Sequence, residues 1–87
     1  MAKVKRGDTV AYLRWSPEAR RWETGAGTCV NPDVKNPWVV AGGEFDSRTL
    51  KVGHVAPAGS AGSELLAAFA AAANAEIAAL ERDLLRA

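Results

Sequence analysis

The stretch YLRWSPEARRWETG, from Tyr12 to Gly25, decides the fold, because it has the form of two strands joined by a tight turn. The first strand begins earlier, and GDTVAYLRW alternates so that Leu13 and Trp15 lie on one face and Arg14 on the other. In the segment SPEA, Pro17 presets the backbone angle of a turn. RRWETG then returns as the second strand. We therefore expect a β-hairpin at this position.

Further short strands follow the hairpin. Gly25 and Gly27 indicate a bulge or sharp bend, after which TCV, WVVAGG and TLKVGHV supply the last strands. The segments NPD and NP bracket a loop between TCV and WVVAGG. Four or five short strands with tight turns in about 55 residues are typical of a small, strongly bent antiparallel barrel.

The two ends of this region resemble a known class of fold. KRGDTVAYL and LKVGHVAP resemble the first and last strands of SH3-like small β-barrels, including the KOW-type barrels of nucleic-acid-associated proteins. The resemblance covers residues 3–57 and implies a barrel, but it implies little about activity because such barrels serve many functions. The sequence lacks the acidic loops and aromatic groove of peptide-binding SH3 domains, which argues against proline-rich ligands.

The small-residue segment APAGSAGS, residues 56–63, separates the strands from a long helical pattern. Ser60 or Ser63 can cap the N-terminus of this helix. The positive charges of Arg82 and Arg86 lie near its C-terminus, where they interact favourably with the negative end of the helix dipole. We predict an α+β chain with a barrel over 1–57, a linker over 58–63 and an oligomerisation helix over 64–86.

The helix carries an apolar seam with alternating spacings of four and three residues, as in a short coiled coil. Its length of about 36 Å exceeds the barrel diameter of roughly 26 Å, so part of it has no surface of its own chain to cover. We expect Phe69 and its neighbours to dock on the barrel and the C-terminal seam to meet another copy, whose number stays open. The predicted interface comprises Leu66, Phe69, Ala73, Ile77, Leu80 and Leu84.

Small size independently favours self-association. A chain of 87 residues has a thin stability margin and usually gains support from disulfides, metals or other subunits. Cys29 has no partner for a disulfide, and Cys29 with the single His54 cannot supply the four ligands of a structural zinc site. Oligomerisation is the support that remains.

Cysteine usage and the absence of a signal peptide favour a cytoplasmic protein. The longest wholly apolar run, residues 65–73, is shorter than the ~20 residues that span a bilayer, so we expect no membrane partner. Richness in Ala, Arg and Gly is typical of a high-GC genome, such as that of an actinobacterium or its phage.

No residue set predicts catalysis. His54 is interpreted as an ordinary strand residue and Cys29 as a small buried hydrophobe. Glu44 and Asp46 are interpreted as solvated turn carboxylates, and the glycine pairs lack a phosphate-loop context. We predict no enzyme activity, no metal and no cofactor.

Aromatic and basic residues gather near the hairpin, and residues 1–22 carry a local charge of +4, from six Lys/Arg against two Asp/Glu. Three indoles are too many for one small core, so we expect Trp15 to lie at the surface beside the arginines, where stacking and forked donors hold anions. The alternative is a solvated face that Glu18 and Glu23 partly neutralise. The predicted ligand-binding residues are Tyr12, Arg14, Trp15, Arg20, Arg21, Trp22, Trp38 and Arg48.

Two functions of different class follow. The first is a non-enzymatic homo-oligomer that binds and sequesters an anionic ligand, either a nucleotide-type small molecule or a short nucleic acid. The second is a protein–protein inhibitor or assembly adaptor, for example a phage-encoded inhibitor of a host protein, in which Trp and Arg form the contact. A structural oligomer without a ligand is a third alternative.

Overall fold

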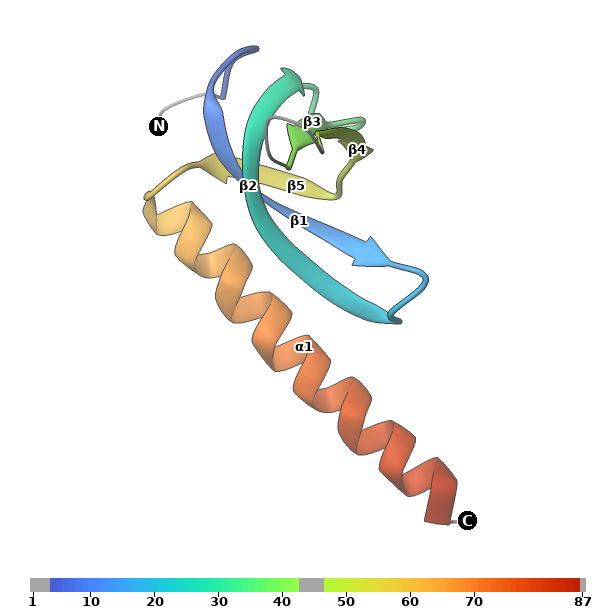
Figure 1. Cartoon of the computed structure of the whole chain (residues 1–87). Coiled ribbons are helices and arrows are strands. Elements are labelled where there is room, and N and C mark those ends of the chain that lie inside the picture. The colour runs from blue at the N-terminus through green and yellow to red at the C-terminus, as the bar shows by residue number, and fades with distance from the viewer. Residues whose placement is uncertain (1–3, 43–46, 87) are drawn as a thin grey trace.

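The structure is a computed structural model that describes residues 4–42 and 47–86, and it confirms the predicted α+β class (Figure 1). One antiparallel five-stranded sheet, in the order β4-β3-β2-β1-β5, packs against one C-terminal helix. The elements are β1 (Thr9–Ser16), β2 (Arg21–Asn31), β3 (Trp38–Ala41), β4 (Arg48–Lys51), β5 (His54–Pro57) and α1 (Ala61–Arg86).

The expected hairpin is β1 and β2, which pair along their whole common length with Trp15 opposite Trp22. The segments expected as a second and a third strand form the single strand β2, which bends strongly (Figure 1). A glycine is required at the bend, because a Cβ on Gly27 would lie 2.5 Å from the carbonyl oxygen of Val40 on β3. The bend lets β3 and β4 curl over one face of the hairpin.

The sheet does not close into the expected barrel, because β4 and β5 are its two outer strands. The antiparallel pairings make β4 and β5 run in the same direction, and only Val52 and Gly53 separate them. Parallel neighbours need a crossover of a dozen residues or more. The two strands are therefore consecutive parts of one extended segment, in which β4 pairs with β3 and β5 pairs with β1. At the break, the N–H of Val52 donates to Pro37 and that of Gly53 to Leu13.

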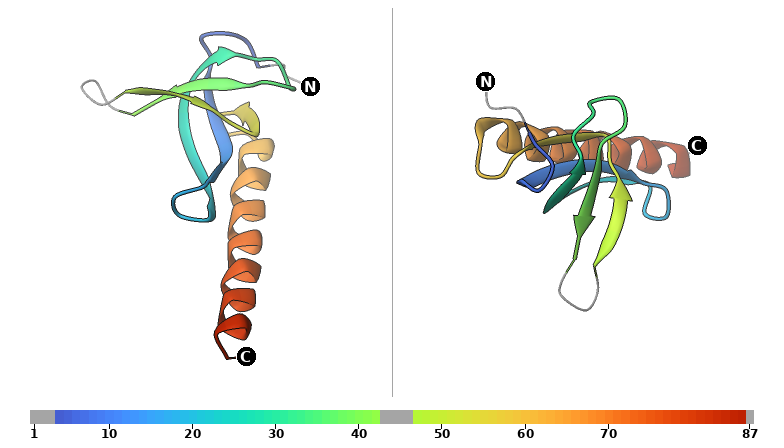
Figure 2. Two further views of the ribbon diagram at one scale, coloured as in Figure 1. Left: turned by 90° about the vertical axis from the view of Figure 1, so that its right-hand side faces the viewer. Right: turned by 90° about the horizontal axis from the view of Figure 1, so that it is seen from above.

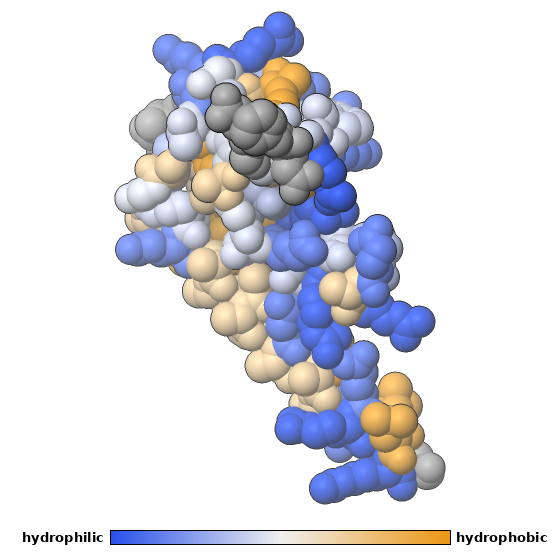
Figure 3. All heavy atoms as spheres, viewed as in Figure 1, coloured by the Kyte–Doolittle hydropathy of each residue, from blue (hydrophilic) through white to orange (hydrophobic). Residues whose placement is uncertain are grey.

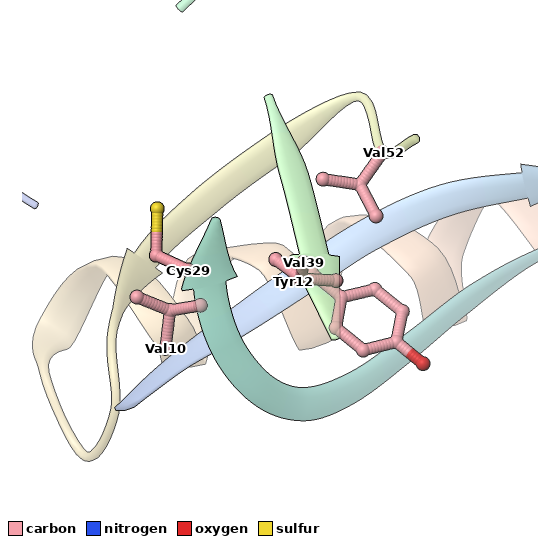
Figure 4. Close-up of a cluster of buried hydrophobic side chains, with 5 residues drawn as sticks. All are labelled: Val10, Tyr12, Cys29, Val39 and Val52. Carbon is pink, nitrogen blue, oxygen red and sulfur yellow. The ribbon is translucent and has the colours of Figure 1, made fainter. Parts of the chain in front are cut away.

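The core lies in two small layers. Inside the curled sheet, one buried cluster is formed by side chains from several strands: Val10, Tyr12, Cys29, Val39 and Val52 (Figure 4). Between the sheet and α1, the buried side chains are Leu13, Ala56 and Ala70. None of the three tryptophans is fully buried, and Trp15, expected at the surface, is 41% exposed.

Helix α1 begins at Ala61, earlier than the expected residue 64. Ser60 caps it, since its hydroxyl accepts the N–H of Ser63 at 3.2 Å. The helix crosses one face of the sheet beside β5, β1 and β2, and its C-terminal end extends past the β1–β2 hairpin (Figures 1 and 2). Among the described residues, the polar contact between helix and sheet that lies nearest the C-terminus joins Glu81 to Arg21.

Candidate binding surfaces

The structure divides the predicted Trp/Arg surface between two faces of the hairpin. Alternation along β1 sends Tyr12 and Arg14 into the hollow of the curled sheet, whereas Leu13 lies on the side of α1. Trp15 and Trp22 form a cross-strand pair on the helix side. The eight predicted residues therefore do not form one surface.

An aromatic row connects the hairpin to the helix. The ring centroids of Trp15 and Trp22 lie 5.4 Å apart, and those of Trp22 and Phe69 lie 5.3 Å apart, both edge to face. Edge-to-face pairs of this kind contribute roughly 0.5–1.5 kcal/mol beyond their buried area. Trp22 thus anchors α1 from the middle of the row, and the two outer members, Trp15 and Phe69, both keep a large exposed area.

Two of the predicted arginines already have carboxylate partners. Arg14 Nη1 donates to Glu23 Oε2 at 3.0 Å, across the β1–β2 pair. Arg21 Nη2 donates to Glu81 Oε1 of α1 at 2.7 Å. These contacts agree with the alternative interpretation that nearby glutamates neutralise the basic stretch.

Arg20 and Trp38 lie apart from these contacts. Arg20 is exposed in the hairpin turn with a φ of 54°, a left-handed conformation. Trp38 is half-buried on β3, where its Nε1 donates to Asn36 Oδ1 at 3.2 Å. Neither residue lines the cavities described below.

One cavity is a groove of about 670 Å³ in the hollow of the sheet, between the hairpin turn and the β3–β4 pair. It combines three predicted residues, from β1 and β4, with two glutamates that the sequence analysis had assigned only to charge neutralisation. The lining residues that matter here are Tyr12, Arg14, Glu18, Glu23, Arg48 and Leu50. Its volume lies within the 300–1,000 Å³ of typical ligand sites.

Tyr12 forms the floor of this groove. Its side chain is only 9% exposed, and the hydroxyl points away from the buried cluster (Figure 4). The ring covers Gly25 on β2, where a Cβ would lie 2.7 Å from the hydroxyl oxygen. Among the described residues this hydroxyl forms no hydrogen bond, and it lines the groove.

The rim of the groove is electrostatically mixed. The pKa of Glu18 is held below its ordinary value of 4.5 by its own backbone N–H, then by the Ser16 hydroxyl and the charges of Arg14 and Arg48. The Ser16 hydroxyl donates to Glu18 Oε2 at 3.2 Å and accepts the N–H of Ala19 at 3.3 Å. Glu18 is therefore an ionised carboxylate at neutral pH, positioned at the turn beside two guanidinium groups.

A smaller cavity of about 290 Å³ lies between the sheet and α1. Apart from an exposed histidine its lining is apolar: Leu13, Trp22, His54, Leu65, Leu66 and Phe69. Among the described residues no group of three or more His, Cys, Asp or Glu side chains could hold a metal ion.

The other candidate reactive residue that the structure describes is Cys29, which lines neither of the two cavities. Burial raises the pKa of its thiol. The predicted pair Glu44 and Asp46 lies outside the described residues.

The predicted oligomer seam is also divided. Leu66, Ala73 and Ile77 are half-buried beside the fully buried Ala70, so this part of the seam is turned toward the chain's own sheet. Leu80 and Leu84 remain 62% and 76% exposed. Apolar residues lie along one flank of α1 and near its C-terminal end in Figure 3. The large exposed apolar side chains of the helix are Leu65, Phe69, Leu80, Leu84 and Leu85.

By length and composition alone, α1 could also cross a membrane, since its most apolar window has a mean hydropathy of 1.3. The longest uninterrupted apolar run, residues 65–73, is too short to have predicted this. Much of this hydropathy comes from alanines, whose small side chains lie between polar residues such as Asn74 and Glu76.

No family model, no curated protein and no solved structure matches this chain.

Proposed function

We propose that this chain is a non-enzymatic, self-associating binding protein that holds an anionic ligand in the groove of its curled sheet. The observation that carries the proposal is the convergence of Arg14 from β1 and Arg48 from β4 on one cavity above the Tyr12 hydroxyl. Planar guanidinium groups donate paired hydrogen bonds to carboxylates and phosphates. Arg48 is exposed, and among the described residues it forms no salt bridge.

The groove favours a small anion over a nucleic acid. Single-stranded nucleic acids are held by aromatic platforms beside a continuous basic track. Here Trp15 and Trp22 lie on the helix side, away from the groove, and Glu18 and Glu23 interrupt the positive charge. We therefore propose that the ligand is recognised by hydrogen bonds inside the groove, and not by stacking on the tryptophans as the sequence suggested.

Self-association is proposed through α1. Leu80 and Leu84, in the C-terminal part of α1, are exposed, and the C-terminal end of this helix extends past the hairpin (Figure 1). Exposed apolar side chains that cluster on one element are typical of protein–protein contacts. The same surface would serve the second candidate function, that of an adaptor or inhibitor that binds another protein. For the third candidate, a structural oligomer without a ligand, this surface alone would be sufficient.

The polar contacts of α1 favour a helix that lies in water and not in a lipid bilayer. Asn74 and Glu81 hydrogen-bond to the hairpin, and a helix inside a bilayer would carry the uncovered edge of β2 into the lipid. We therefore keep the proposal of a cytoplasmic protein without a membrane partner.

The resemblance to SH3-like small barrels is likewise kept as a proposal, in the form of a barrel with an open seam. It is supported by the return of β5 to β1 and by the strong bend of β2. It assigns no ligand.

The test is an NMR titration of the ¹⁵N-labelled protein with inorganic phosphate and with adenosine monophosphate. We expect saturable shifts at Tyr12, Arg14 and Arg48, and at least a tenfold loss of affinity in Arg48→Ala. Lys51→Ala is the matched control, because Lys51 is an exposed cation on the same strand outside the groove. Equal losses in both variants would indicate non-specific charge attraction and contradict the proposal.

A further inference from the structure

The charge balance of the groove restricts the ligand beyond its being an anion. Two guanidinium groups, of Arg14 and Arg48, face the same cavity as two carboxylates, of Glu18 and Glu23. A multiply charged phosphate bound between the arginines would also lie close to both carboxylates, and like charges in a partly enclosed site repel strongly. The charges of the described lining residues balance, so they complement a ligand whose anionic group is accompanied by a separate cationic group.

The hydrogen-bonding capacity of the groove points the same way. The salt bridge between Arg14 and Glu23 uses one nitrogen and one oxygen, so the fork and the carboxylate both keep capacity for a ligand. The ring of Tyr12 is largely buried, and its hydroxyl lines the groove without a hydrogen bond to another described residue. A tyrosine hydroxyl both donates and accepts, and in this place it is suited to a polar group, such as an amide, between the two charged ends of a ligand.

We infer that the groove binds a short zwitterionic ligand of the peptide type, with a free carboxylate at Arg14 and Arg48 and a free ammonium group at Glu18. This inference rests on the proposed function: the carboxylate is the anionic group that the two arginines hold, and the inference adds an ammonium group at the other end of the same ligand. The apolar side chain of Leu50 in the lining gives such a ligand one non-polar contact. The open volume of about 670 Å³ accommodates a few linked residues in place of a single free ion.

The test compares four probes in the same titration: trialanine with free ends, N-acetyl-trialanine, trialanine amide and inorganic phosphate. These peptides share a backbone and differ only in which end is charged. We expect trialanine with both charges to bind at least tenfold more tightly than either capped form or phosphate. Shifts should centre on Tyr12, Arg14 and the turn at Glu18.

Two variants assign the ends of the ligand. Glu18→Gln should remove the preference for trialanine over its N-acetyl form, while binding of the N-acetyl form itself persists. Glu18 lies in an exposed turn, so this change should not affect folding. Tyr12→Phe should weaken trialanine binding several-fold and leave the circular dichroism spectrum unchanged, because the ring that fills the core is retained.

The outcomes separate this inference from the proposed function. If N-acetyl-trialanine or phosphate binds at Arg48 as tightly as trialanine, the groove is a simple anion site and only the inference is wrong. If neither phosphate nor any peptide shifts the groove signals, both the inference and the proposed function are wrong.

Discussion

The side chain of Asn74 hydrogen-bonds to both backbone groups of Trp22: its Oδ1 accepts the N–H at 2.8 Å, and its Nδ2 donates to the carbonyl at 2.9 Å. Strand β3 pairs with β2 only from Gly27 to Asn31, so the outer edge of β2 near Trp22 has no neighbouring strand. The carboxamide of a helix residue therefore satisfies an open strand edge. This contact, together with the Trp22–Phe69 ring pair and the Arg21–Glu81 ion pair, holds α1 against β2.

Replacing Asn74 should measure the strength of this contact. Asn74→Ala removes two partly buried hydrogen bonds, each with a net contribution of about 0.5–1.5 kcal/mol, so we expect the free energy of unfolding to fall by roughly 1–3 kcal/mol. Urea denaturation followed by tryptophan fluorescence gives the value. Glu76→Ala, on an exposed neighbouring position of α1, is the control and should change stability little. Similar values for the two variants would show that the carboxamide does not hold the helix.

The bend of β2 should be intolerant of any side chain at Gly27. A methyl group there would meet the backbone oxygen of Val40 at 2.5 Å, and β3 would have to move away. Because overpacking typically costs about 1–3 kcal/mol, Gly27→Ala should lower the thermal midpoint by several degrees.

Gly53→Ala is the matched control for the bend, since its Cβ would meet only the oxygen of Leu13 at 3.4 Å. We expect a much smaller change at this position. A Gly27→Ala protein as stable as Gly53→Ala would show that β2 and β3 adjust freely at the bend.

The ion pair between Arg21 and Glu81 predicts a weak pH dependence of stability. The hydrogen bond and charge of Arg21 lower the pKa of Glu81 below its ordinary value of 4.5. A carboxyl group with a lowered folded pKa stabilises the protein above its unfolded pKa, and this stabilisation is lost as the pH falls through the folded value. Thermal midpoints of the wild type should therefore fall more steeply below pH 4.5 than those of Glu81→Gln.

The pair is surface-exposed, so its effect should be small and should weaken further in high salt. Glu76→Gln, which removes an exposed carboxylate on the same helix, should leave the pH profile of the wild type unchanged. If Glu81→Gln also keeps the wild-type profile, Arg21 does not bind Glu81 in solution.

The exposed end of α1 should determine the oligomeric state. Leu80→Asp combined with Leu84→Asp places two charges on the proposed contact surface, and we expect a monomer by light scattering coupled to gel filtration. Ala75→Asp adds charge at an exposed position of the same helix that is not part of the predicted seam, and it should leave the mass unchanged. A wild-type monomer, or a double variant with the wild-type mass, would contradict self-association through this end.

Sequence patterns were sufficient for the elements whose causes are local. Alternation of side chains in GDTVAYLRW predicted β1, and apolar periodicity after residue 63 predicted α1, because each pattern depends on neighbours along the chain. The exposure of Trp15 followed from counting the indoles that one small core can hold. The groove was only partly predicted: Tyr12, Arg14 and Arg48 were named, but Glu18 and Glu23 were not considered as lining residues.

Sequence alone determined that this chain combines short antiparallel strands with one long helix, since hairpin turns and helical periodicity are encoded within a few residues. Only the tertiary structure decided that β4 and β5 do not pair, that Asn74 covers the edge at Trp22, and that Arg14 and Arg48 share a cavity. These outcomes depend on how far β2 bends and on where the helix lies across the sheet. Both are set by contacts between residues distant in sequence, such as Gly27 with Val40 and Arg21 with Glu81, which no local pattern contains.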